Sequence, residues 1–365
     1  MALWACGFNA FSQLTEKELG SEEEKLGQED LREWSPIFTS QVIDFFYGDF
    51  STTSFFTSTS STLEHQYLGL PTPQNKARDT VHIDHSTQLH SPQHLPFPSP
   101  SPKPRQLAII SSGALALIPS FNQKAIWIYN NPIPSQPPTS RFAFPTAVTS
   151  IVGNLAAFHV LTEDGVVYSL GDARFPALLG REVTESRPAS NPFEIPDLID
   201  LPTGPITKIA SGGTLTAAIT ARNDLYIWGQ VPLSAHNSSS GYFLPFFDRG
   251  DEEMEHVGEG VISVDVYGLD VIDVAVGRDY MLAVTTDEGG EERKVWGIGS
   301  NAHGQLGLGN VEGVREWVEM SLKGLGRGVI KGVWTGYENT FLVVGDGQRE
   351  NRENNSQTAD MALDG

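Results

Sequence analysis

Short segments in which apolar and polar residues alternate recur along the chain, each followed by a glycine and a second apolar segment. Val271 to Thr285 (VIDVAVGRDYMLAVT) and Ile206 to Thr220 (ITKIASGGTLTAAIT) show this shape. Alternation with period two, bounded by turn residues, is typical of short, half-buried antiparallel strands. The same shape occurs at 42–56, 147–162 and 330–344, and the central glycines of the five segments are Gly48, Gly153, Gly212, Gly277 and Gly336.

A third strand is predicted after each polar turn that ends a pair. Its segments are VVYSLG at 166–171, LYIWG at 225–229 and KVWGIG at 294–299. From Gly153 onward the central glycines are 59, 65 and 59 residues apart (212 − 153, 277 − 212, 336 − 277). These spacings are long for one hairpin but natural for a four-stranded unit. Repeated strand units with almost no helical pattern predict a β-propeller.

The number of units is six by this pattern. A weaker unit lies at 107–130, where LAIISSGALALI is followed by KAIWIYN. A seventh unit would have to lie in the poorly patterned region around residues 60 to 105. We therefore expect an all-β fold, a single propeller of six to seven four-stranded blades.

The two ends of the chain repeat one another. LWACGFNAFSQL at 3–14 aligns without a gap to VWGIGSNAHGQL at 295–306, at a constant offset of 292 (296 − 4). The last unit, Ile330 to Val344, has two strands but no third, and Leu3 to Gly7 is a third strand with no first two. We expect both ends to form one blade, with Leu3 to Gly7 alongside Thr340 to Val344, which closes the ring and removes exposed sheet edges.

The Trp-Gly segment 296–309 (WGIGSNAHGQLGLG) and the IASGG and VAVGR strand pairs resemble repeats of the regulator of chromosome condensation family of β-propellers. Three departures set the chain apart. The histidine that usually follows the central glycine is Ser51, Leu215, Tyr280 and Asn339 here, the third-strand tryptophan is Leu170 in one unit, and Gly304 becomes Ser12. The positions that carry the repeat outside the central glycines are Trp4, Gly7, Trp228, Gly229, Trp296, Gly297, Gly299, Gly304 and Gly307.

Domain boundaries follow from composition. We expect one propeller domain over residues 1–345, interrupted by an acidic insertion at 16–33 and by a Pro-, Ser- and His-rich insertion at about 71–105. The second insertion is expected to be disordered because it has too little apolar surface to bury. Residues 346–365 are expected to form a disordered polar tail.

The net charge of −21 and the single cysteine, Cys6, argue against some classes of partner and some cellular locations. An acidic surface repels nucleic-acid phosphates and anionic lipids, and no basic patch overrides it. No run of apolar residues approaches the length of a membrane span, and the N-terminus does not resemble a signal peptide. One cysteine cannot form an intrachain disulfide, which fits a reducing compartment. We expect no direct nucleic-acid or membrane binding and a cytoplasmic or nuclear location.

The candidate chemical sites all favour structural interpretations. Gly297, Gly299 and Gly304 vaguely resemble a dinucleotide fingerprint, but no helix follows to receive the phosphates. The segment HIDHSTQLHSPQH at 82–94 holds possible zinc ligands, but it lies in the insertion with no cysteine nearby. Cys6 and His159 sit on predicted strands among apolar residues, as packed side chains do. We expect no catalytic, metal or cofactor site.

The turns after the third strands offer a better candidate for binding. They form one rim of the ring and carry aromatic and arginine side chains, which are frequent binding anchors. An alternative is that these rings fold inward over the blade tops. The candidate partner-binding residues are Phe8, Asn9, Phe11, Arg174, Phe175 and His303.

The family resemblance implies a non-enzymatic scaffold that binds a protein partner. An acidic platform favours a basic partner. Within the family, the chain looks most like the fungal propeller subunit that pairs with a small zinc protein in Elongator-dependent tRNA modification and diphthamide synthesis. The alternative is a guanine-nucleotide exchange factor for a Ran-like small GTPase. A propeller that partners a histone demethylase would share the scaffold logic.

Overall fold

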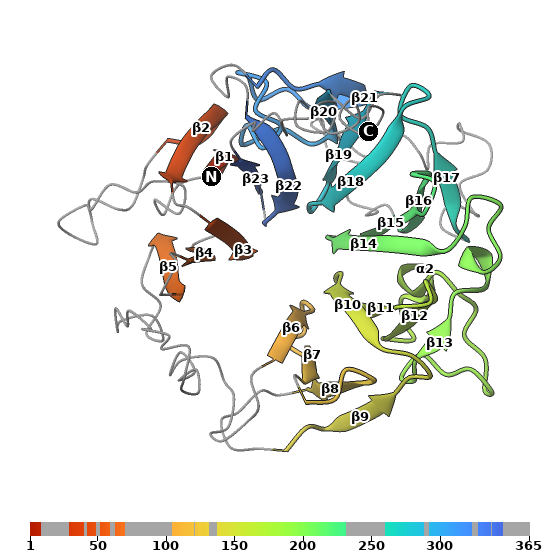
Figure 1. Cartoon of the computed structure of the whole chain (residues 1–365). Coiled ribbons are helices and arrows are strands. Elements are labelled where there is room, and N and C mark those ends of the chain that lie inside the picture. The colour runs from red at the N-terminus through yellow and green to blue at the C-terminus, as the bar shows by residue number, and fades with distance from the viewer. Residues whose placement is uncertain are drawn as a thin grey trace, which may run out of the picture.

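In the computed structural model, antiparallel sheets stand like blades around a central axis (Figure 1). The described residues form six sheets, five of four strands and one of three. The sequence prediction of an all-β propeller is confirmed. The structure describes residues 1–8, 29–39, 42–48, 52–58, 63–69, 104–119, 121–130, 137–230, 260–287, 292–322, 328–336 and 338–345.

Five sheets follow the order of the chain, with the first strand of each nearest the axis (Figure 1). The three-stranded sheet comprises β3 (Val42–Gly48), β4 (Thr52–Ser58) and β5 (Leu63–Gly69). The next comprises β6 (Pro104–Ile109), β7 (Leu115–Pro119), β8 (Ala125–Tyr129) and β9 (Ser140–Ala143). It is followed by β10 (Val148–Gly153), β11 (Ala157–Thr162), β12 (Val167–Gly171) and β13 (Phe193–Glu194).

Two further blades complete the chain-ordered set. One comprises β14 (Ile206–Gly212), β15 (Leu215–Thr220), β16 (Leu225–Gly229) and β17 (Ile262–Val264). The other comprises β18 (Asp270–Val276), β19 (Tyr280–Thr286), β20 (Arg293–Gly299) and β21 (Val314–Glu319). Short helices α2 (Pro176–Leu179) and η1 (Pro196–Leu198) lie in loops. No helix among the described residues is long and apolar enough to cross a membrane.

The sixth sheet joins the two ends of the chain, as the repeated sequence predicted. Its strand order is β22 (Val329–Thr335), β23 (Asn339–Gly345), β1 (Ala2–Gly7) and β2 (Leu31–Thr39). Strand β1 runs antiparallel to β23, with Leu3 opposite Val343 and Cys6 opposite Thr340. The ring is therefore closed through a blade shared by both ends (Figure 1).

The predicted C-terminal ends of both insertions overlap strands in the structure. Residues 31–33, assigned to the acidic insertion, begin strand β2, where Arg32 and Glu33 are exposed while Trp34 and Ile37 are buried. Both charged side chains are exposed on an outer strand, so composition alone misplaced the boundary. Residues 104 and 105, assigned to the second insertion, begin β6. Residues 16–28 of the first insertion, residues 71–103 of the second, which hold the histidine-rich segment, and the tail at 346–365 lie outside the described residues.

Strand register corrects the alignment of the repeat. Gly171, Gly229 and Gly299 pair with Ala157, Leu215 and Tyr280, the first residues of their second strands. Counting back from these pairs, the equivalent of Trp296 is Tyr168 rather than Leu170, and Trp228 is equivalent to Ile298. The sequence alignment was wrong by two residues, because residues two apart on a strand lie on the same face and follow the same apolar pattern. The corrected column is Trp4, Trp127, Tyr168, Tyr226 and Trp296, all half-buried.

Five of the six inner strands in the described residues have a β-bulge near their starts, for example between Val271 and Asp273 in β18. A bulge disturbs the ladder and leaves a backbone group to be satisfied elsewhere. Here neighbouring blades satisfy it. Ile151 donates its backbone N–H to Oε1 of Gln106 from the preceding blade, at 3.0 Å. Val333 likewise donates to Oδ2 of Asp273, at 3.3 Å. The bulges therefore link adjacent inner strands around the axis.

Apolar side chains fill the spaces between blades. Between the β14–β17 and β18–β21 sheets, Ile219 and Ile227 pack with Val274 and Ile298 in one buried cluster. Trp228 is fully buried between the β10–β13 and β14–β17 sheets. Burial between sheets, rather than within one, holds each blade against the next.

Candidate functional site

One end of the propeller gathers two turns from each blade. Successive strands of a blade run in opposite directions, so the turn after the first strand and the turn after the third lie at the same end. A repeated hydrogen bond ties the two together. Its donor is the residue after the third strand: Phe8 to Glu338 O at 2.9 Å, Asp172 to Ala156 O at 3.0 Å, Gln230 to Thr214 O at 3.0 Å, and Ser300 to Asp279 O at 2.8 Å. We call this end the upper rim.

Glycines at the ends of the third strands allow this close approach. Gly7 has a φ of +110°, and a Cβ there would lie 2.4 Å from the carbonyl oxygen of Glu338. Gly229 has a φ of +135° and would meet Thr214 O at 2.1 Å. A side chain would separate the two turns, so the repeat requires glycine at these positions.

The loop after β20 folds around the buried side chain of Asn301. Its Oδ1 accepts the backbone N–H of Leu306 at 2.8 Å, and its Nδ2 donates to Asn310 O at 3.0 Å. Gly304, Gly307 and Gly309 all have positive φ in this loop. Its glycines therefore build turns, and the loop packs on strand β2, where Gly309 donates its backbone N–H to Arg32 O at 2.8 Å.

His303, in this loop, lies between two carboxylates. Its Nδ1 is 2.9 Å from Oδ2 of Asp30, and its Nε2 is 3.0 Å from Oε2 of Glu338. The Phe8 ring meets the imidazole edge-on, with centroids 5.1 Å apart. An imidazolium ring donates to both carboxylates, whereas the neutral ring donates to only one. The sequence prediction placed Phe8 and His303 on one rim, and the structure brings them into contact.

Arg278 extends this group on the turn between β18 and β19. Its guanidinium is 3.5 Å from Oε1 of Glu338 and 3.8 Å from Oδ2 of Asp279. Burial raises the pKa of Asp279, and the neighbouring Arg278 partly lowers it. The half-exposed Arg278 therefore sits among partly desolvated carboxylates. We call Phe8, Asp30, Arg278, His303 and Glu338 the His303 cluster.

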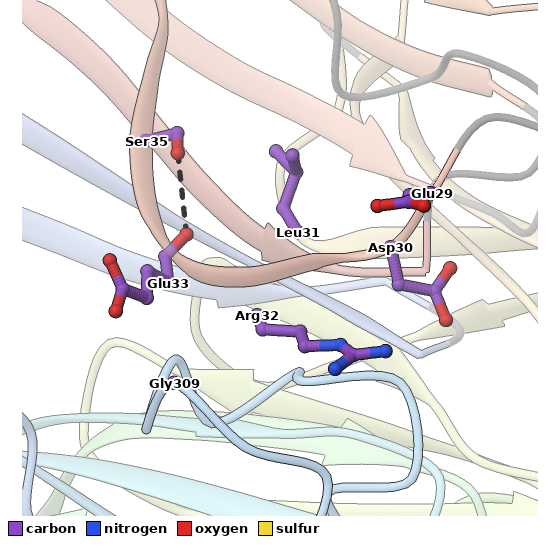
Figure 2. Close-up of a pocket in the computed structure, with 7 residues that line it drawn as sticks. All are labelled: Glu29, Asp30, Leu31, Arg32, Glu33, Ser35 and Gly309. Atoms are coloured by element: carbon purple, nitrogen blue, oxygen red, sulfur yellow. Dashed lines mark hydrogen bonds between the residues drawn. The ribbon is translucent and has the colours of Figure 1, made fainter.

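A shallow, open hollow of about 540 Å³ lies beside the cluster (Figure 2). In Figure 2 the Arg32 side chain extends between the start of β2 and the loop at Gly309. Ser35 donates its hydroxyl to Glu33 O at 3.4 Å. The lining carries three carboxylates and one guanidinium, and it comprises Glu29, Asp30, Leu31, Arg32, Glu33, Ser35 and Gly309.

Arg174 and Phe175 form a separate group on another blade. Arg174 is exposed, bonds to Asp172 through its side chain at 2.6 Å, and lies 5.7 Å from the Phe175 ring centroid. The hydrogen bond from Arg174 lowers the pKa of Asp172. Phe175 packs partly against Leu178 and Leu179. The candidate rim residues thus fall into two groups, while Asn9 and Phe11 lie outside the described residues.

Sequence reasoning missed Asp30, Arg278 and Glu338. They come from three distant segments, and only the docking of β2 on the loop after β20 brings Asp30 to His303. No local motif marks them. The carboxylates were hidden among many others in an acidic chain, so the sequence held no signal that could have selected them.

Cys6 and His159 are buried, as predicted. Burial raises the pKa of the Cys6 thiol, and its Sγ lies 3.3 Å from Gln305 O. His159 is enclosed between two blades, where burial lowers its pKa to about 3. Across the ranges that the structure describes, no three His, Cys, Asp or Glu side chains are placed to hold a metal ion.

Comparison with known proteins agrees with the fold and its repeated turns. The chain is a β-propeller of the RCC1 type. It is 31% identical over 131 residues to the human E3 ubiquitin-protein ligase HERC2, a match of 34% of this chain and 2% of that protein. It is 29% identical over 147 residues to the RCC1 domain-containing protein RUG3, mitochondrial, of Arabidopsis thaliana, covering 40% of this chain and 29% of that one. The matches thus span less than a third of either relative. No protein-family model matches the chain.

Solved structures cover nearly the whole chain. Prp20p from Saccharomyces cerevisiae has a TM-score of 0.59 at 13% identity, covering 96% of this chain and 92% of that one. Human WBSCR16 has a TM-score of 0.54 at 13% identity, covering 95% and 99%. At such low identity these likenesses speak to the fold alone.

Proposed function

We propose that the chain is a non-enzymatic scaffold that binds a protein partner through its upper rim. The observation that carries this proposal is the His303 cluster, where an aromatic ring, an arginine and two carboxylates meet at the junction of two blades. Aromatic and arginine side chains are common anchors of protein interfaces. The role of the propeller is to hold these groups on rigid turns.

The partner should be basic. The net charge of −21 and the acidic hollow beside the cluster attract a positively charged surface and speed its encounter. Our specific candidate is a small zinc protein serving Elongator-dependent tRNA modification and diphthamide synthesis, in the cytoplasm or the nucleus. The family resemblance of the repeats supports this candidate.

Affinity purification of the full chain followed by mass spectrometry tests the proposal. We expect a small zinc protein to co-purify and to be lost as salt is raised. Phe8→Ala combined with Glu338→Ala should abolish capture without changing the melting temperature. Phe121→Ala is the control, because Phe121 is 64% exposed on a hairpin at the other end of the ring. Capture that survives the rim substitutions, or a native pull-down without a zinc protein, contradicts the proposal.

The alternative function is nucleotide exchange on a Ran-like GTPase. It is favoured by the likeness to Prp20p, whose crystal structure was described with its binding properties to Gsp1p and histones. The test is release of labelled GDP from Ran. Catalysed release that Glu338→Ala diminishes supports exchange, and release at the spontaneous rate excludes it.

A further inference from the structure

Tyr267 occupies an unusual turn between β17 and β18. Leu269 donates its backbone N–H to Val266 O at 3.0 Å, which closes the turn. The two central residues both have positive φ, 54° for Tyr267 and 70° for Gly268, the φ pattern of a type I′ turn. Asn, Asp and Gly favour the first central position, whereas a bulky side chain is disfavoured there. Backbone strain of this kind often accompanies a functional residue.

The Tyr267 ring is fixed from two sides. Its hydroxyl donates to Trp317 O at 2.8 Å, and its ring centroid lies 5.2 Å from that of Trp296 at a tilt of 54°. Trp296 is itself held, because its indole N–H donates to the hydroxyl of Thr285 at 2.8 Å. A ring held this way loses little freedom when a ligand binds.

Comparing Tyr267 with the corresponding aromatic residue of another blade shows how much exposure packing alone requires. Phe144 occupies the corresponding linker of the β10–β13 blade and packs on the equivalent aromatic, Tyr168, with centroids 5.0 Å apart. Phe144 is only 6% exposed, whereas Tyr267 is 58% exposed. Packing between blades needs a covered ring, as Phe144 shows. The exposure of Tyr267 goes beyond that need.

Acidic residues flank Tyr267 in the sequence and lie in the neighbouring ladder. Asp265 and Asp270 are exposed at either side of the turn, and Asp265 Oδ1 accepts the backbone N–H of Gly268 at 2.9 Å. Glu319 lies opposite Trp296 in the β20–β21 ladder, where it pairs with Lys294 at 3.2 Å. A cation over an aromatic face gains from the ring quadrupole, and nearby carboxylates add to the attraction.

We propose that Tyr267, Asp265 and Asp270 form a docking point for an arginine-bearing segment of a protein partner. The planar guanidinium stacks on the ring and donates paired hydrogen bonds to a carboxylate, which an ammonium group does less well. The linkers between blades lie at the end opposite the upper rim, because strand direction alternates. This site is therefore separate from the rim and does not depend on the proposed function.

A fluorescein-labelled peptide, Gly-Arg-Gly-Arg-Gly, titrated against the full chain and followed by fluorescence anisotropy, tests the site. Tyr267→Asn should weaken binding about three- to thirty-fold, the range for one cation–π contact. Asn suits the positive φ of the turn, so this variant keeps the fold. Asp265→Asn with Asp270→Asn should weaken binding and flatten its salt dependence. The lysine version of the peptide should bind more weakly.

Phe121→Ala is the control. It removes an exposed aromatic ring from another blade at the same end of the ring, and it should leave peptide affinity unchanged. Equal affinity of the wild type and Tyr267→Asn, at equal melting temperature, would show that the peptide is held only by the overall negative charge. An equal loss in Phe121→Ala would overturn the site in the same way.

Discussion

Nε2 of His159 lies 3.1 Å from the indole nitrogen of Trp228 and 3.0 Å from the carbonyl oxygen of Leu178. The indole only donates and the carbonyl only accepts, so no single protonation state of Nε2 satisfies both. A positive ring would face the indole donor in a fully buried seam. Burial is the largest cause of the lowered pKa, the Leu178 carbonyl opposes it, and Arg181 adds to it. His159 therefore packs between two blades as a neutral imidazole.

Acid should destabilise the protein through His159. Its pKa falls from the usual 6.5 to about 3 in the folded state. Between about pH 6.5 and pH 3, His159 binds a proton in the unfolded chain but not in the folded chain. The free energy of unfolding therefore falls as the pH drops through this range. The expected contribution is about 1.4 kcal/mol per pH unit. Urea unfolding across this range should show the slope, and His159→Gln should reduce it. An unchanged slope would mean that other groups cause the acid sensitivity.

Gly7→Ala should weaken the blade that joins the two ends. The substitution places a Cβ 2.4 Å from Glu338 O at a φ of +110°. We expect about 1–2 kcal/mol from the backbone conformation and about 1–3 more from the clash. Gly113→Ala is the matched control, since Gly113 has a φ of +80° with nothing within 4 Å. Thermal unfolding of both variants measures the difference. Equal losses would show that contact across the two turns is unimportant.

Arg181 should be essential to the loop between β12 and β13. Its buried guanidinium, whose pKa burial lowers to about 10, stays charged at neutral pH. It donates to both Oγ and O of Ser169, and to the carbonyls of residues 182, 187, 188 and 191. Arg181→Ala should cost about 2–4 kcal/mol, because several buried acceptors lose their donor.

Lysine should not replace this arginine. Arg181→Lys keeps the charge but lacks the fork that reaches several acceptors, so it should recover only part of the loss. The exposed Arg174, whose ion pair is on the surface, is the control, and Arg174→Ala should leave the melting temperature nearly unchanged. Full recovery by lysine would show that charge matters more than geometry.

Lys208 and Asp273 form an ion pair between adjacent inner strands, and the two should contribute unequally. Asp273 also accepts the backbone N–H groups of Val274 and Val333. Asp273→Ala leaves these groups without their acceptor and should cost about 2–3 kcal/mol. Lys208→Ala should cost less than about 1 kcal/mol. A double-mutant cycle with urea unfolding separates the pair from the backbone bonds. Equal losses would contradict the bridging role.

The ring and its closure were predictable because the local alternation of apolar and polar residues identifies most of the strands. Alternation marked the first three strands of most blades. The repeat offset, together with the missing third strand of the last unit, placed Leu3 to Gly7 beside β23. Fourth strands were harder to see. Strands β13 and β17 pair over only two and three residues and follow their third strands at a long distance in the sequence. So short a segment shows no period. Such strands are defined by the sheet they join.

The register of the third strands needed the structure. Trp228 and Trp296 both precede a glycine, which suggested equivalence, yet pairing with the second strands places them two residues apart. Residues two apart point to the same face, so the hydrophobic pattern fits either alignment. Pattern fixes the face of a strand, and only its neighbour fixes the position.

The rim residues were predictable one at a time but not as a site. Phe8 and His303 could be placed on one edge because both follow a third strand. Glu338 and Arg278 belong to turns after first strands, and Asp30 precedes an outer strand. Their meeting depends on how the blades pack, and that arrangement arises from contacts between residues hundreds of positions apart.

The shared blade also sets the order of events during synthesis. Strand β1 leaves the ribosome before the other strands of the propeller, but its neighbour β23, which places Leu342 opposite Trp4, leaves after all of them. Until then the nascent protein carries a partly paired apolar strand that other chains could capture. Residue 345 must be synthesised before β23 can pair with β1 and close the propeller. A ribosome that stalls before this point would leave a product that chaperones must hold or proteases remove.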